Sequence, residues 1–407
     1  MLRKILKGFV YLFLLLLGYE LVIYFLVPVY DFPPPQPFSG DKLYNPYQGM
    51  DSTCWRKANF HFHARAWGGL TNGRNNTREA FYKTYKALGY DAPQISNYQS
   101  IDDHFRDSSF YVPAYEHGFG IRKKHQVLIG AHKVLWLDYS LFQNLHDKQH
   151  MLNLLREDNE IVAIAHPDWE NGYSLHDMQS LTNYDLVEAL DQNWRSIPQW
   201  DAALSAGRAV FLLADDDAHD LANPYEIQRI CTYVNSRENK GPALVRALKA
   251  GKSFGAELYT GGCETFAQKA INARSIPRVN SIQVTNDTLW ISVSGKPMKI
   301  TFIGQNGEEK KIVKLTNKAW YKFRAGDTYI RTEIVFFHYD KYTGFSPGTI
   351  FYLNPVFRYD GTIPSNPLLA EVNIPRTWIF RIFGFGSLIL LVSVGFYLRR
   401  NKRIGWD

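Results

Sequence analysis

Histidines and carboxylates follow short apolar runs at several points of this 407-residue chain. They form three motifs: His61-Phe62-His63, His166-Pro167 and Asp217-Ala218-His219. Neutral imidazoles and carboxylates are the ligands that borderline divalent metals prefer. Because alternate side chains of a strand share a face, His61 and His63 can hold one ion together. The motifs therefore predict a metal-dependent hydrolase.

Strand and helix patterns alternate along the part of the chain that carries these motifs. Strands are predicted at 57–63, 92–96, 126–129, 161–165, 186–190 and 210–214, and helices at 77–88, 151–156 and 200–206. Such alternation is typical of parallel strands covered by helices, with functional residues where strands end. From about residue 278, short runs separated by turn sequences instead predict a small antiparallel β-sandwich of roughly 80 residues.

Two apolar runs near the ends of the chain are long enough to span a bilayer. Residues 9–29 follow three basic residues, and residues 382–398 precede four more. The positive-inside rule then places both termini in the cytoplasm and residues 31–375 outside it, in the periplasm or at the cell surface. A cleaved signal peptide is the alternative for the first run and a buried core helix for the second. The length of the first run and the lack of a small-residue cleavage site favour an uncleaved anchor.

These patterns divide the chain into six segments. We expect a cytoplasmic tip and transmembrane helix at 1–30, a proline-rich linker at 31–50, a hydrolase domain at 51–276, a β-sandwich at 277–362, a linker at 363–376, and a transmembrane helix with a basic cytoplasmic tail at 377–407.

The formal net charge of +7 does not indicate a nucleic-acid partner. Seven of the basic residues lie at the two extreme ends, so the remainder of the chain is close to neutral: Arg3, Lys4, Lys7, Arg399, Arg400, Lys402 and Arg403. Phosphate backbones are bound by basic patches on the folded surface, and none is predicted in the middle of this chain.

Over residues 57–260 the ordered motifs resemble the PHP (polymerase and histidinol phosphatase) family of metal-dependent phosphoesterases. The matching residues are His61-Phe62-His63, Glu116 after Pro113, His125 before an apolar run, His166-Pro167, and Asp217-Ala218-His219. The resemblance implies a distorted seven-stranded (βα) barrel, which is a TIM-like α/β fold, with up to three metal ions.

The resemblance also implies how the ligands would be shared. One ion would be held by His61, His63, Glu116 and Asp217, and a second by Glu116, His125 and His166, with Glu116 bridging the two. His219 would belong to a third ion. His132 is an alternative to His125, but it follows the apolar run rather than opening it.

The chain departs from the family pattern at the third ion. Asn72 and Asn97 stand where the family has aspartates, and Tyr98 stands where it has a histidine. We therefore expect two ions, unless His104 or His117 substitutes for the missing ligands.

A pair of divalent cations would activate water and hold a phosphoryl group in line for displacement. Arg65, Arg122 and Lys124 are candidates to offset the charge that develops on the phosphoryl oxygens, or else are solvated surface residues. Asp216 is expected to orient a ligand histidine or to cap a turn.

Taken together, the sequence predicts a membrane-anchored, extracytoplasmic phosphoesterase with two ions of zinc, manganese or iron. Its partners would be the membrane and a phosphorylated small molecule or cell-envelope substrate. A catalytically degenerate binding or scaffolding protein is one alternative, and a hydrolase of ester or amide bonds is another.

Overall fold

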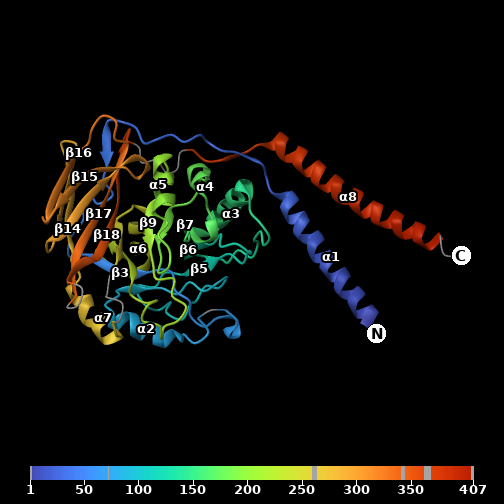
Figure 1. Ribbon diagram of the computed structural model, residues 1–407, viewed down its shortest axis with the longest axis horizontal. Coiled ribbons are helices and arrows are strands. Elements are labelled where there is room, and N and C mark those ends of the chain that lie inside the picture. Colours follow the sequence, from blue (N-terminus) through green and yellow to red (C-terminus); the bar gives the residue numbers. More distant parts are fainter. Residues whose placement is uncertain (1, 72, 259–263, 341–343, 362–367, 405–407) are drawn as a thin grey trace.

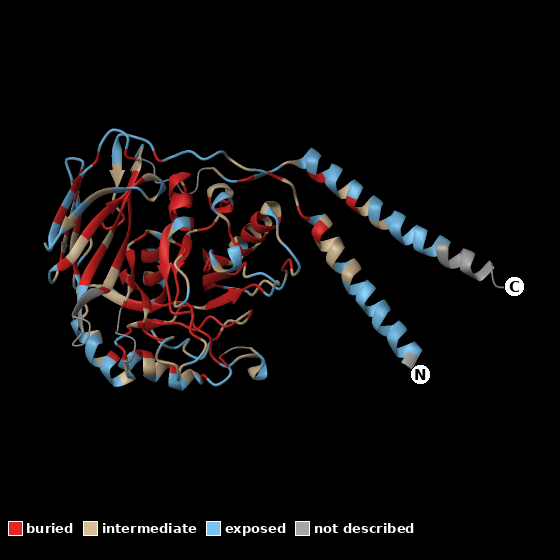
Figure 2. Cartoon of the chain, in the orientation of Figure 1, coloured by how far each residue is buried: buried red, intermediate tan, exposed pale blue. Residues whose placement is uncertain are grey.

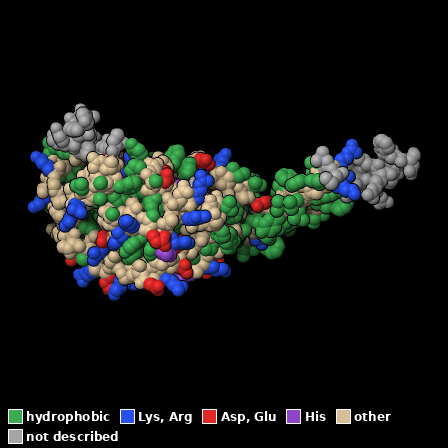
Figure 3. Space-filling view, turned by 90° about the horizontal axis from the view of Figure 1, so that it is seen from below, with side chains coloured by type: hydrophobic (Ala, Val, Ile, Leu, Met, Phe, Trp, Pro, Cys, Tyr) green, Lys and Arg blue, Asp and Glu red, His purple; other side chains and the backbone are tan. Residues whose placement is uncertain are grey.

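The computed structural model describes residues 2–71, 73–258, 264–340, 344–361 and 368–404. Two terminal helices, α1 (Leu2–Leu26) and α8 (Ile374–Ile404), extend from a body of mixed sheets and helices (Figure 1). Both are long and apolar enough to cross a membrane by length and composition, and only 6% of the apolar stretch of each helix is buried (Figure 2). A space-filling view shows hydrophobic side chains along these helices (Figure 3). At their bases, β1 (Tyr30–Asp31) pairs with β19 (Glu371–Val372) and holds the two segments together.

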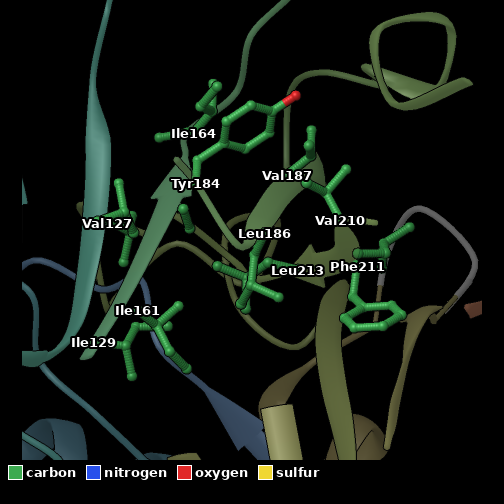
Figure 4. Close-up of a cluster of buried hydrophobic side chains, with 14 of the residues drawn as sticks. Val127, Ile129, Ile161, Ile164, Tyr184, Leu186, Val187, Val210, Phe211 and Leu213 are labelled. Carbon is green, nitrogen blue, oxygen red and sulfur yellow. The ribbon is translucent and has the colours of Figure 1, made fainter. Parts of the chain in front are cut away.

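A five-stranded sheet forms the centre of the body, in the order β5-β6-β7-β8-β9. Its strands are β5 (Ala114–His117), β6 (Gln126–Ala131), β7 (Asn159–Ile164), β8 (Leu186–Leu190) and β9 (Phe211–Ala214). Side chains from β6 to β9 converge in one apolar cluster, among them Val127, Ile161, Leu186 and Leu213 (Figure 4). Helices α3 (Leu145–Glu157), α4 (Leu175–Ser180) and α5 (Ile197–Ser205) follow β6, β7 and β8.

A nine-stranded sheet continues from this body into the C-terminal part of the chain, in the order β15-β14-β17-β18-β11-β10-β3-β4 with β2 beside β18. The strands are β2 (Lys42–Tyr44), β3 (Trp55–Asn59), β4 (Ala92–Pro93), β10 (Ile230–Asn235), β11 (Ser253–Glu257), β14 (Pro297–Ile303), β15 (Glu309–Lys314), β17 (Tyr329–Asp340) and β18 (Gly344–Tyr359). Helices α2 (Arg78–Ala87), α6 (Gly241–Lys249) and α7 (Phe266–Asn272) lie between its N-terminal strands or after β11.

Two isolated parallel bridges join the two sheets, Phe62 to Ala218 and Tyr98 to Glu116. Through them, β3 to β9 follow one another around a ring. The strand pairing does not establish the expected barrel of seven βα units, because β6 runs antiparallel to both β5 and β7. Residues 118–125 between β5 and β6 form a loop instead of a helix, so the strand direction reverses there.

A three-stranded sheet of β12 (Val279–Thr285), β13 (Thr288–Val293) and β16 (Lys318–Lys322) packs against β14 and β17. Ile282, Ile291 and Tyr321 from this sheet share an apolar core with Phe302 and Ile334. The two layers overlap the strands predicted after residue 278. Since β18 pairs with β11, one sheet runs through both the N-terminal body and the C-terminal strands. The domain boundary predicted at residue 276 remains a prediction.

A buried ion pair fixes the C-terminal part to the body. Arg331 of β17 donates from Nε and Nη2 to the two carboxylate oxygens of Asp201 in α5, at 2.7 and 2.8 Å. Its third nitrogen donates to Glu333 at 2.6 Å, and the Arg331 side chain is only 3% exposed. Each of these charges depends on its partner, because water does not reach the pair.

Asp201→Ala is expected to destabilise the protein by about 3–5 kcal/mol, because it leaves the Arg331 guanidinium buried beside a single carboxylate. Urea unfolding of the full chain in detergent measures the change. The exposed Glu308–Lys310 pair is the matched control, and Glu308→Ala should cost less than about 1 kcal/mol. Equal losses for the two variants would contradict a locking role for the buried pair.

Candidate metal centre

The histidine pair is held against the end of β9 by backbone bonds. The predicted strand at 57–63 ends early, at Asn59, so His61 and His63 lie just beyond β3. His63 N donates to Ala218 O at 3.1 Å, and Asp217 N donates to His61 O at 3.0 Å. These bonds bring two motifs together that are more than 150 residues apart in the chain.

Four side-chain atoms face one another at this junction: His61 Nε2, His63 Nε2, Glu116 Oε2 and Asp217 Oδ1. The imidazole nitrogens lie 3.0–3.3 Å from the two carboxylate oxygens. All four atoms are buried, yet none has a hydrogen-bond partner. Ligands about 2.0 Å from a tetrahedral zinc ion are about 3.3 Å apart, so these separations fit one bound cation.

The other oxygen of Glu116 faces a second group. Glu116 Oε1 lies 2.5 Å from His125 Nδ1 and 3.4 Å from His166 Nε2, and all three side chains are buried. Glu116 lies in β5, His125 immediately precedes the antiparallel strand β6, and His166 follows β7. One carboxylate therefore contributes an oxygen to each of two ligand groups, which is the arrangement of a bridging ligand.

Two residues of these groups have backbone conformations that residues other than glycine rarely adopt. His166 has φ of 27° and Asp217 has φ of 46°, both in the left-handed region. Such conformations cost of order 1–3 kcal/mol and persist only where the surrounding structure enforces them. The chain here is shaped to aim these two side chains at the centre rather than to relax the backbone.

The carboxylates and imidazoles of this centre shift one another's pKa. Burial alone would lower the pKa of His61, but Asp217, Glu188 and Glu116 raise it well above its ordinary value. Burial would raise the pKa of Glu116, yet His125 and His61 hold it well below its usual range. Burial lowers the pKa of His125, which favours the neutral imidazole that binds metals. Three carboxylates crowded around one imidazole favour positive charge in this centre, which bound cations would supply.

Glu188 is a site residue that the sequence analysis did not identify. It lies in the middle of β8, fully buried, with Oε1 2.9 Å from His61 Nδ1. Its other oxygen accepts from the backbone N–H of His166 at 3.2 Å. With Nδ1–H donating to this carboxylate, His61 turns its Nε2 toward the ligand group. The available signal was a glutamate inside the apolar run 186–190.

Asp191, which follows the same strand, was also missed. One of its oxygens accepts from the backbone N–H groups of Asn193 and Trp194, and the other is buried without a partner. Burial raises the pKa of Asp191 to about 7. Asp191 is thus a further buried carboxyl, directly after the strand that contains Glu188.

His219 and Tyr98 lie at the centre's outer edge, where the third ion was considered. The His219 ring stacks on His63 at 4.2 Å, and its Nε2 is 3.3 Å from Asp217 Oδ1. Tyr98 stacks on His63 at 4.4 Å, and burial together with the charge of Glu116 raises the pKa of its hydroxyl well above its ordinary value. Asn97 accepts from the N–H of Ala64, while Asn72 lies outside the described residues. Within the described chain, His219 belongs to neither ligand group.

The expectation that Asp216 orients a ligand histidine is wrong. Its carboxylate instead accepts from the backbone N–H groups of residues 228–230 and from the hydroxyl of Tyr85. It therefore takes the other predicted role, that of fixing a turn, because the chain rotates the side chain of residue 216 away from that of Asp217. Glu188 orients His61 in its place.

The alternative histidines and the predicted cations lie outside the two ligand groups. His132 is exposed, His104 faces Glu79, and both ring nitrogens of His117 are engaged, by Gln126 and the carbonyl of Leu137. Three basic residues were predicted to face the phosphoryl group. Arg65 and Arg122 are exposed, whereas Lys124 is buried.

Comparison with known proteins gives one structural neighbour. It is the crystal structure of a two-domain protein from Bacteroides vulgatus that contains a predicted PHP-like metal-dependent phosphoesterase, and it is 11% identical. The match covers 84% of this chain and 99% of that one with a TM-score of 0.35, and at that score it establishes neither a shared fold nor a shared activity. No family model and no curated protein matches the chain. The function is accordingly inferred from the centre itself.

Glu188→Ala should lower metal affinity about 10–100-fold, because His61 loses the carboxylate that fixes its ring and tautomer. Competition with a chromophoric chelator measures the dissociation constant. Glu188→Gln, which keeps one acceptor oxygen, should recover part of the loss. Glu160→Ala removes an exposed glutamate from the neighbouring strand and should leave affinity unchanged. Unaltered binding in Glu188→Ala would refute this orienting role.

Proposed function

We propose that this protein is a membrane-anchored phosphoesterase that uses two divalent cations. The single observation that supports this most is Glu116, whose two oxygens face two separate groups of buried ligands. A pair of ions so placed would polarise a phosphoryl ester and the attacking water as Lewis acids. Imidazole and carboxylate ligands suit zinc, manganese or iron.

The side chains around the ligands have separate tasks in this proposal. Glu188 holds the His61 ring, and Tyr98 stacks on His63 and closes that side of the centre. Arg65, exposed two residues after His63, would offset phosphoryl charge from solvent. Burial of the ligands excludes water from all sides except the outer edge, where His219 remains partly exposed.

The proposal places both termini in the cytoplasm and the folded body outside it. Support comes from the exposed apolar surfaces of α1 and α8. It also comes from the basic residues at the ends of these helices that lie next to the chain termini. The substrate would then be a phosphorylated small molecule or a cell-envelope component.

His61→Ala is expected to reduce hydrolysis of an aryl phosphate about 1,000-fold, because one ligand group loses an imidazole and its cation. The assay uses purified full-length protein with added manganese or zinc, and metal content is measured in parallel. His104→Ala, which removes an exposed histidine, is the matched control and should remain fully active.

Absence of turnover in the wild type with either metal would reject the phosphoesterase proposal. If two ions per chain were still bound, aryl esters and amides would be tested next, since the same ions polarise carbonyl groups. If no ion were bound, the binding or scaffolding alternative would be favoured.

A further inference from the structure

Three loops near the metal centre expose large apolar side chains to solvent. The loops span residues 65–71 with 73–75, 118–124 and 132–142. Their side chains are between 40% and 91% exposed, and we call them the rim patch: Trp67, Leu70, Phe119, Ile121, Trp136, Leu141 and Phe142. Isolated exposed apolar residues are common, but several on adjoining loops mark an interaction surface.

The loops of the rim patch are fastened to one another. Asp138, which is buried, accepts from the backbone N–H groups of Phe119 and Gly120 at 2.9 and 3.1 Å. Ile121 N donates to Ser140 O at 2.8 Å, so the second and third loops are joined. Trp136 meets Trp67 of the first loop edge to face at 5.6 Å. The patch is thus built into the fold in its exposed form.

The rim patch also leads to the metal centre. Trp67 Nε1 donates to the backbone carbonyl of Tyr98 at 2.8 Å. Tyr98 in turn stacks on His63, and its backbone pairs with that of Glu116. A molecule bound against the patch would therefore lie beside the outer edge of the centre.

The same loops carry basic side chains and almost no acidic ones. Their exposed or half-buried basic residues are Arg65, Arg74, Arg122, Lys123 and Lys133. Asp138 is the one acidic residue in the three ranges, and it is buried. Aromatic side chains mixed with lysine and arginine match the interface of an anionic bilayer, where both groups are favoured.

A direct contact ties the patch to the outer end of the first apolar helix. Tyr24, near the end of α1, stacks on Phe142 at 4.8 Å. Its hydroxyl accepts from the backbone N–H groups of Leu141 and Phe142 at 3.1 and 3.0 Å and donates to Phe142 O at 2.8 Å. The third loop therefore lies where α1 would leave the bilayer. The folded body lies at this end of α1, away from the N-terminus (Figure 1).

We propose that the rim patch docks on the surface of an anionic bilayer and turns the metal centre toward it. The substrate is then a phosphate ester whose alcohol is a lipid, held at the membrane surface within reach of the centre. The docking rests on the patch and on α1, whereas the substrate class also rests on the proposed phosphoesterase function.

Docking is tested by fluorescence quenching in full-length protein. The protein is placed in nanodiscs of phosphatidylcholine and phosphatidylglycerol, with bromine on the phosphatidylcholine chain close to its headgroup. Trp136→Phe should reduce the fraction of fluorescence that bromine quenches, because Trp136 lies in the lipid surface. Trp290→Phe removes a tryptophan of the β-sandwich that is 47% exposed, and it should not reduce that fraction. Equal quenching in the wild type and Trp136→Phe would overturn the docking.

The substrate class is tested by comparing two phosphate esters. Ile121→Glu should lower hydrolysis of phosphatidic acid in the same nanodiscs about tenfold, because a charge replaces a side chain buried in lipid. Hydrolysis of soluble aryl phosphate should be unchanged. Ile312→Glu, at an exposed site on β15, is the control and should affect neither rate.

The two tests fail in different ways. If Ile121→Glu lowered both rates equally, or if the wild type hydrolysed aryl phosphate and left phosphatidic acid intact, the lipid substrate would be overturned. If the wild type hydrolysed neither ester, the phosphoesterase proposal would fail with it, while the quenching result would still decide whether the patch docks.

Discussion

Much of this structure depends on the burial of Glu116 between two groups of imidazoles. Its carboxylate lies out of reach of water, and its Oε2 faces His61 and His63 without a hydrogen bond. A buried charge without compensation costs several kcal/mol, so such a group requires a cation or a protonated partner. The arrangement of these side chains therefore favours the binding of a cation.

The ring of strands is the part of the fold that makes this burial possible. Glu116 comes from β5, and the His61 and Asp217 segments meet through the bridge between Phe62 and Ala218. Left-handed backbone at His166 and Asp217 turns two ligands inward at a cost that packing must cover. The nine-stranded sheet and the Asp201–Arg331 pair then hold the C-terminal strands against the same body.

The first apolar helix is in contact with the folded body at Tyr24. The contact between Tyr24 and Phe142 couples α1 to the loop 132–142. Trp136 of the same loop contacts Trp67, which donates to the backbone carbonyl of Tyr98 at the edge of the centre. Contacts of the loop 132–142 thus connect α1 to Trp67, and through it to the edge of the centre.

Residue types and local periodicity were enough to predict much of the site. His61, His63, His166 and Asp217 were named from local motifs, and Glu116 and His125 from the resemblance to the PHP family. The apolar runs located most strands within a few residues, because periodicity is a local signal. Only the tertiary structure decided which oxygen of Glu116 faces which histidine, and that Glu188 rather than Asp216 orients His61. It also decided the antiparallel course of β6 and the meeting of three loops in one patch. Those outcomes depend on distances between segments far apart in the chain, which side-chain type and spacing do not encode.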